Sequence, residues 1–422
     1  MTSFEILIQN GRTKSSADPR RISMRLGDEC LTRLIRRGSH EPDDWLEAPP
    51  WWRIRWEPAP HTDLNAEWRL AHHLSSAGAG YHWPNVSIWG EGSRVGIAVH
   101  ADANNLKPSL KFIAQPRLSY VPSSTVEDAI DRFVGHVLEH VGEASDGLDT
   151  ECRQLQSERA DPAVATWRKL EAMLGFDPDD APEGLVDSLE ALTERYGLEP
   201  LQEVALAHQG ERATEALNDC IEAAKSSNVL IRTPIDFTRK DRIEVGRSSL
   251  EPPRRFAVRV ANQLRHWLVV PPGPIGNKRL SEIVGTNIDC IRTDRRSTFD
   301  IPYPLRLRQE TASKLALRST WSHTRRFELC RSLGDIIWSC NDAMGPLSAA
   351  KSERQKFQRA FAQGLLCPFA DLQAYINTDK PDEDDIHAAA RHFDVSERLI
   401  ETTLVNNQVI DQASFEQMVD AS

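Results

Sequence analysis

The chain has 422 residues, of which 62 are acidic and 51 are Lys or Arg, so its formal net charge is −11. This length is enough for two or three domains. No apolar run is long enough to cross a membrane, and the N-terminal stretch lacks the basic-then-apolar pattern of a secretory signal. The seven cysteines are scattered, without a CxxC pair, and an odd number argues against a disulfide framework. We therefore expect a bacterial-type cytoplasmic protein.

The charges are unevenly distributed along the chain. Residues 141–230 carry 20 acidic and 7 basic side chains, whereas residues 231–330 carry 10 acidic and 20 basic ones. Two interpretations fit this asymmetry: two solvated surfaces of opposite sign, or two parts that bind different partners.

Residues 1–145 are expected to form a Trp-rich α+β domain built on an antiparallel sheet. Short alternating or apolar runs bounded by turn residues are typical of strands and hairpins. The expected strands are Phe4–Gln9, Ile22–Leu34, Trp51–Trp56, Val86–Trp89, Val95–His100, Lys111–Ala114 and Leu118–Val121.

Seven of the eleven tryptophans lie between positions 45 and 89. Such a density can form a stacking surface for single-stranded bases, or it can fill the core of a small sheet. In a strand, Trp52 and Trp56 point to one face and Arg53 and Arg55 to the other, which favours the core.

A helix is expected at Ser124–Val141, because Ser124 and Glu127 have the spacing of a capping box. It carries His136, Glu139 and His140 as HxxEH, the inverted zinc-peptidase motif. The two histidines lie beside the apolar stripe, so a solvated helix face is the competing interpretation. Acidic candidates for a third ligand follow downstream, namely Glu211 and Glu215.

The remaining boundaries follow from composition. Residues 146–226 are expected to be helical, because their apolar positions recur at helical spacing. Residues 227–252 are polar and basic and are interpreted as a linker. Residues 253–422 are expected to form a mostly helical domain with a small sheet.

The most informative stretch is Trp321–Ile337. Apolar residues at helical spacing predict a helix over Thr324–Trp338, preceded by a short strand at Lys314–Arg318. A strand followed by a helix that reads Arg-Arg-Phe-x-Leu-x and then His-Glu-Leu-Gly-His begins the active site of the ImmA/IrrE-like zinc metallopeptidases. The chain resembles that family here, since Leu333 and Gly334 fit the motif.

The resemblance continues through residues 253–422. The family writes Glu-Ala-Asn-x-Phe-Ala-x-x-Leu-Leu-Met-Pro after the motif helix, and this chain matches it at Phe361, Ala362, Leu365, Leu366 and Pro368.

The chemical positions of the motif are replaced. Arg331 and Asp335 stand at the two zinc-binding histidines, Ser332 at the general base, and Phe357 at the glutamate that the resemblance makes the third ligand. A guanidinium has no acceptor and cannot bind zinc. We expect Arg331 and Asp335 to form an ion pair in the former metal pocket, with Phe357 filling the ligand gap.

The resemblance therefore implies a degenerate zincin-like pseudo-peptidase domain with no catalytic residue, no metal and no cofactor. It also implies the setting: a non-catalytic regulatory or adaptor protein of a bacterial stress-response, toxin–antitoxin or phage-defence system. Its partner would be a protein, such as a helix-turn-helix regulator or another component of the system, bound without cleavage.

Two alternatives stay open. One is a cryptic metallopeptidase with a relocated site, built from His136, Glu139 and His140 or from Cys330, Asp335 and His323. The other is nucleic-acid binding through the basic segment 231–330. Its candidate phosphate contacts are Arg254, Arg255, Arg292, Arg295, Arg296, Arg306, Arg308, Arg325 and Arg326.

The C-terminal tail also has the pattern of a helix-turn-helix, with a turn at Val395-Ser396 and a helix at Glu397–Asn406. Arg398 is the only Lys or Arg in that helix, which favours packing over DNA binding.

Overall fold

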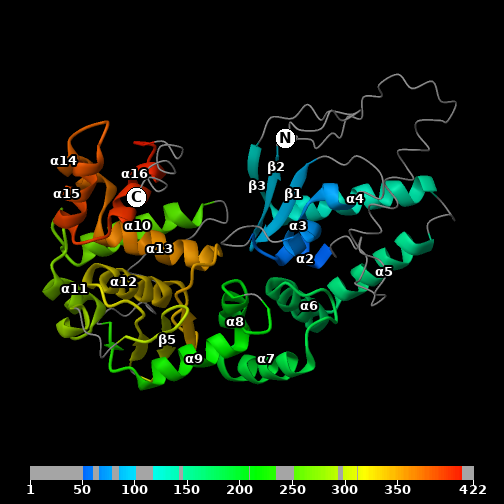
Figure 1. Cartoon of the computed structure of the whole chain (residues 1–422), viewed down its shortest axis with the longest axis horizontal. Coiled ribbons are helices and arrows are strands. Elements are labelled where there is room, and N and C mark those ends of the chain that lie inside the picture. The colour runs from blue at the N-terminus through cyan, green and yellow to red at the C-terminus, as the bar shows by residue number, and fades with distance from the viewer. Residues whose placement is uncertain are drawn as a thin grey trace. The chain divides into compact units, whose positions relative to one another are not determined.

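A computed structural model of the chain describes residues 51–59, 66–77, 85–100, 117–141, 146–208, 210–233, 251–292, 298–310 and 312–410. The chain divides into two compact units, Met1–Pro182 and Glu183–Ser422. Both combine helices with a small antiparallel sheet, so the fold is α+β with a mostly helical C-terminal part, as the sequence predicts (Figure 1). No helix in the described part is long and apolar enough to span a membrane.

The first unit contains a three-stranded sheet in the order β1 (Val86–Glu91), β2 (Arg94–Val99) and β3 (Arg117–Pro122). The β1–β2 hairpin turns at Gly92, whose φ of 75° is a left-handed conformation that glycine adopts without strain. The hairpin and β3 confirm three of the predicted strands. Those at Phe4–Gln9, Ile22–Leu34 and Lys111–Ala114 lie outside the described residues.

Helices complete this unit. They are α2 (Trp51–Trp56), α3 (Ala66–His72), the 3-10 helix η1 (Leu74–Ala77), α4 (Ser123–Val141), α5 (Asp146–Ala160) and α6 (Pro162–Leu174). The start of α6 follows the sequence directly, because the Asp161 carboxylate accepts from the backbone N–H groups of Ala163 and Val164.

The strand prediction for Trp51–Trp56 is wrong, because this segment is the helix α2. The five alternating residues 52–56 are too few to distinguish the period of a strand from that of a helix. The contact that favours the helix involves the next residue, Glu57. Arg53 pairs with Glu57 one helical turn later, with Nε 2.7 Å from Oε2. The core interpretation of the tryptophans is confirmed for Trp51 and Trp52, which pack in a buried cluster.

The second unit contains the four-stranded antiparallel sheet β4-β6-β5-β7. Its strands are β4 (Leu230–Ile231), β5 (Leu305–Arg308), β6 (Ser313–Ala316) and β7 (Met344–Pro346). Its helices are α7 (Glu183–Tyr196), α8 (Leu198–Ala205), α9 (Ala213–Ser226), α10 (Pro253–Trp267), α11 (Asn277–Val284), the 3-10 helix η3 (Ile288–Cys290), α12 (Ser322–Trp338), α13 (Glu353–Leu366), α14 (Phe369–Ile376), α15 (Glu383–Phe393) and α16 (Glu397–Asn406).

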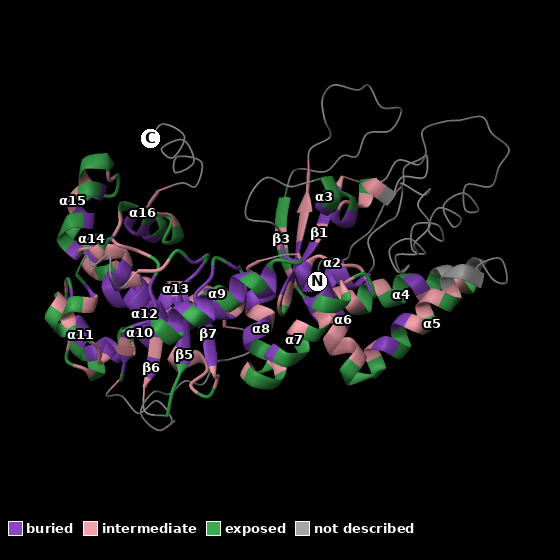
Figure 2. Ribbon diagram, turned by 60° about the horizontal axis from the view of Figure 1, so that its bottom comes forward, coloured by how far each residue is buried: buried purple, intermediate pink, exposed green. Residues whose placement is uncertain are grey.

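Helix α13 is the centre of this unit, because it packs against both α10 and α12. Figure 2 shows these helices as largely buried. Gly364 lets α13 approach α10, since an added Cβ would lie 3.2 Å from the Cβ of Ala261. Helix α9 packs on β5 and β6. The predicted helix at 324–338 and the strand before it are confirmed as α12 and β6.

The expected domain boundaries differ from this division. The helical segment 146–226 does not form one unit, because α5 and α6 belong to the first and α7, α8 and α9 to the second. The expected linker at 227–252 begins inside the second unit. Val229 and Ile231 are buried there, and β4 pairs with β6. Residues 234–250 lie outside the described part.

Candidate functional site

A buried polar cluster lies between α12, α13 and β5 in the second unit. Arg331, Ser332 and Asp335 lie on one face of α12 and are buried. Gly334 lets α13 come close, because an added Cβ would lie 3.0 Å from the ring of Phe361. Arg331, Ser332 and Asp335, which replace the metal-site residues of the resembled family on α12, thus lie close together.

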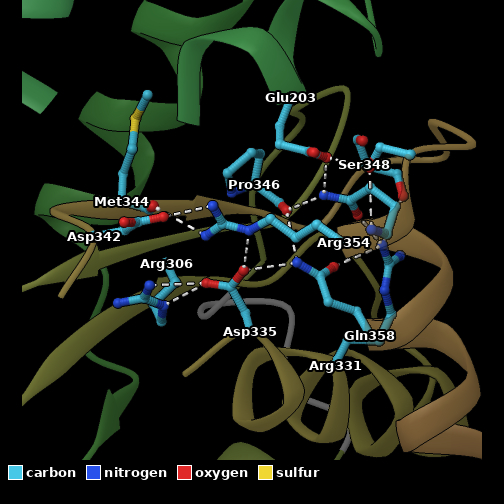
Figure 3. Close-up of polar contacts among 12 residues, drawn as sticks. Glu203, Arg306, Arg331, Asp335, Asp342, Met344, Pro346, Ser348, Arg354 and Gln358 are labelled. Carbon is cyan, nitrogen blue, oxygen red and sulfur yellow. Dashed lines mark hydrogen bonds and ion pairs between the residues drawn. The ribbon is translucent and has the colours of Figure 1, made fainter. Parts of the chain in front are cut away.

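Asp335 holds three donors at once (Figure 3). Arg306 of β5 donates from Nε to Oδ2 at 2.8 Å, and its Nη2 lies 2.8 Å from the same oxygen. Arg354 of α13 donates from Nε to Oδ1 at 2.7 Å, and Gln358 Nε2 donates to the same oxygen at 2.7 Å. Asp335 is fully buried, and protein donors bind both of its carboxylate oxygens.

The expected ion pair between Arg331 and Asp335 is wrong. Arg331 instead donates from Nη2 to the carbonyl oxygen of Ser348 at 2.6 Å and to Gln355 Oε1 at 2.7 Å. Gln358 connects the two charged residues, because its Oε1 accepts from Arg331 at 3.2 Å while its Nε2 binds Asp335. Helical spacing allows the pair, but the carboxylate of Asp335 is bound by the guanidinium groups of Arg306 and Arg354 instead.

The assignment of Phe357 to the ligand gap is also wrong. Its ring is fully buried in the apolar core, with ring centroids 5.1 Å from Phe256 and 5.2 Å from Trp338. The α13 side chains that reach the cluster are Arg354, Gln355 and Gln358, which share another face of the helix.

The cluster extends to α8 and to the loop after α12. Arg354 Nη1 donates to Asp342 Oδ2 at 2.5 Å. Glu203 of α8 accepts at Oε2 from the Ser352 hydroxyl at 2.6 Å and from Gln355 Nε2 at 3.1 Å. None of these partners was predicted. The sequence does not single out positions 354, 355 and 358, because every residue from 353 to 359 except Phe357 is polar.

Burial acts differently on the charged groups. Burial alone would raise the pKa of Asp335, but the adjacent Arg354 and Arg306 outweigh it and hold that pKa below its ordinary value. Burial, with the charge of Arg359, lowers the pKa of Arg331 to about 9. Burial raises the pKa of Glu203 despite the charge of Arg354. Asp335 is therefore ionised and Arg331 is cationic at neutral pH.

This arrangement does not fit a zinc ion. Arg331 offers no acceptor, and the carboxylate of Asp335 could reach a metal only by giving up two guanidinium partners. Cys330 packs in the apolar core, where burial raises the pKa of its thiol to about 12. His323 stacks on Trp321 near the start of α12. Across the described residues, no group of three His, Cys, Asp or Glu side chains is placed to hold a metal.

The HxxEH motif lies on α4 of the first unit. Its residues His136 and Glu139 are exposed, and the side chain of His140 lies outside the described part. The candidate third ligands, Glu211 and Glu215, belong to the second unit and are exposed as well.

The arginines proposed to contact nucleic acid fall into three groups. For Arg306, Arg325 and Arg326 the prediction is wrong, because all three are buried. Arg325 Nε donates to the carbonyl oxygen of Cys290 at 2.7 Å, for example. Two others, Arg295 and Arg296, lie outside the described residues. The remaining ones, Arg254, Arg255, Arg292 and Arg308, are exposed or partly exposed.

The predicted C-terminal helix at 397–406 is confirmed as α16. Its buried residues, Leu399, Ile400 and Leu404, pack in the core of the second unit, and the helix contacts α15. Arg398 is exposed.

The opposite pKa directions predict opposite pH effects on stability. A carboxyl group with a raised folded-state pKa destabilises the fold as pH rises through that pKa. We expect Glu203→Gln to leave the free energy of unfolding unchanged or to raise it at neutral pH, and to lose this advantage near about pH 4. Asp335→Asn should do the reverse, since a depressed pKa contributes stability that is lost only in acid. Urea unfolding of both variants between about pH 2 and pH 8 measures this, because the contribution of Asp335 is lost only below its unfolded pKa of about 3.9. A larger loss for Glu203→Gln at neutral pH than in acid would contradict the account.

Comparisons of the chain with protein-family models, with curated proteins and with solved structures found no match.

Proposed function

We propose that the chain is a non-catalytic regulatory or adaptor protein of the bacterial cytoplasm, whose residues 253–422 are a degenerate ImmA/IrrE-like domain that binds a protein partner. One observation carries the proposal: Asp335, the one carboxylate at the motif positions, is bound by Arg306 and Arg354 and by the carboxamide of Gln358. The guanidinium of Arg331 has no acceptor for a metal, and the buried hydroxyl of Ser332, which has no hydrogen-bond partner, replaces the carboxylate that would act as the general base.

Binding needs surface groups rather than the cluster. Trp321, at the start of α12, has 68 % of its surface exposed. Tryptophan is enriched among the residues that contribute most to binding at protein interfaces. This supports a protein-binding role for the surface at the start of α12. The resemblance supplies the setting, a stress-response, toxin–antitoxin or phage-defence system.

The test has a binding arm and a cleavage arm. The full chain is used to capture partners in cells of the native host, beside Trp321→Ala and Tyr375→Ala. Tyr375 is a matched control, because it is an exposed aromatic residue of the same unit, 42 % exposed. We expect a stoichiometric protein partner that is lost with Trp321→Ala and kept with Tyr375→Ala.

The captured partner is then incubated with the purified chain and added zinc or manganese. We expect it to stay intact. Cleavage by the unaltered chain that disappears in Asp335→Ala would refute a non-catalytic role, and equal capture by all three proteins would refute the binding surface.

A further inference from the structure

A second polar feature of this unit lies on its surface, away from the buried cluster. Helix α10 and the end of α16 border a groove of about 840 Å³. Its described lining includes Arg254, Arg255 and Arg259 and five carboxamide side chains, and it contains no carboxylate and no aromatic ring. The groove is therefore positively charged inside a chain whose net charge is −11.

Two of these arginines have no anionic partner within the described residues. Arg254 is half-buried, and burial alone lowers its pKa, without an acidic neighbour to oppose it. Arg255 is exposed and forms no ion pair with a described residue. Arg259 differs, because its Nη2 lies 2.8 Å from Glu251 Oε2. Among the described residues no carboxylate offsets the charge of half-buried Arg254, so this site favours an anionic ligand.

The position of the two arginines also favours an anionic ligand. They lie in the first turn of α10, a helix of 15 residues whose N-cap, Pro252, gives no side-chain cap. A helix N-terminus carries partial positive charge and uncapped N–H donors, so cations are unfavourable there and anions are favoured. An anion at this place would be bound by the helix end and by both guanidinium groups.

The lining of the groove also contains carboxamide side chains. Asn262 and Gln263 belong to α10, and Asn407 directly follows α16. A carboxamide carries both a donor and an acceptor and matches the polar edges of bases. The groove thus combines two cations with carboxamides suited to bases and sugars.

We propose that this groove binds a short stretch of single-stranded nucleic acid, with phosphates at Arg254 and Arg255 and bases along the carboxamides. Arginine forks match phosphate oxygens in geometry as well as charge. The volume suits a few nucleotides. A single strand leaves the hydrogen-bonding edges of its bases free for the carboxamides, whereas a duplex pairs those edges. Because the lining has no aromatic ring, affinity depends on the phosphates rather than on base stacking. This activity goes beyond the proposed protein-binding role and does not depend on it.

The test is fluorescence anisotropy of a labelled single-stranded DNA with the full chain. We expect binding at low salt, with log K falling against log salt by roughly 0.7 for each phosphate contacted. The double variant Arg254→Glu and Arg255→Glu should weaken binding by about tenfold or more. The same change of charge at Arg292 and Arg308, both exposed and outside the groove, should weaken it by less than about threefold.

Two further measurements keep the outcome clear. Charge reversal could disturb α10, so the neutral double variant Arg254→Gln and Arg255→Gln is measured as well, with its folding checked by circular dichroism. It should also lose affinity, because it removes both phosphate contacts. A duplex of the same sequence and a polyglutamate peptide are used as competitors, and both should compete poorly. No binding at low salt, equal losses in the groove and control variants, or efficient competition by polyglutamate would each overturn the proposal.

Discussion

Replacing Asp335 with alanine is expected to lower the free energy of unfolding of the second unit by about 3–5 kcal/mol. The carboxylate is fully buried and pairs with Arg306 and Arg354, which are also buried. Its removal leaves two cations in a low-dielectric interior without a counter-ion. Urea unfolding of the full chain, with hydrogen exchange of α12 and α13 to assign the loss to this unit, measures the effect.

The matched control is Asp289→Ala. Asp289 also pairs with an arginine, Arg292, at 3.4 Å, but both side chains are exposed. An exposed pair of this kind contributes little, so the midpoint of unfolding should hardly change. Equal effects of the two substitutions would show that the buried cluster does not stabilise the unit.

Gly345→Ala is expected to destabilise the same unit by about 3 kcal/mol or more. A Cβ built on Gly345 of β7 would overlap Asp335 Oδ2 and would lie 3.0 Å from Arg306 Nε. Either the strand or the ion pair must move, and both belong to the buried centre. The same unfolding measurement detects the loss.

Gly184→Ala is the control for this change. Gly184 lies in α7, and nothing lies within 4 Å of an added Cβ there. Alanine should stabilise this helix by about 0.5 kcal/mol, because glycine loses more backbone entropy on folding. If Gly345→Ala were as well tolerated as Gly184→Ala, the close approach of Asp335 to β7 would be wrong.

Helix α12 and the partners of Asp335 show what the sequence can and cannot predict. The helix at 324–338 and the burial of one of its faces follow from apolar spacing, and α12 confirms them. The partners of Asp335 do not follow. Arg306 lies 29 residues before it and Arg354 lies 19 residues after it, and only the packing of β5 and α13 brings them to one carboxylate.

Two local errors have similar causes. In Trp51–Trp56 the alternating pattern was too short to fix the period, and the ion pair of Arg53 with Glu57, one helical turn later, favours the helix. In α13 the motif alignment placed Phe357 in the pocket. One residue along a helix turns the side chain by about 100°, so Gln358 reaches the cluster and Phe357 enters the apolar core.

The buried cluster supports the proposal of a domain without catalysis. Arg331, Asp335, Arg354, Gln355 and Gln358 form one hydrogen-bonded network across α12 and α13, in place of the metal that the resemblance puts there. Two buried polar atoms beside it, Arg331 Nε and Ser332 Oγ, have no hydrogen-bond partner. The proposed functions therefore depend on surface groups, namely Trp321 and the groove at Arg254 and Arg255.

The central claim is that the cluster occupies the motif positions and leaves no place for a metal. It is tested most directly by the metal content of the full chain, purified without a His tag and incubated with equimolar zinc. The account predicts less than about a tenth of an equivalent bound. About one equivalent of zinc, kept by Asp289→Ala and lost in Asp335→Ala, would contradict it.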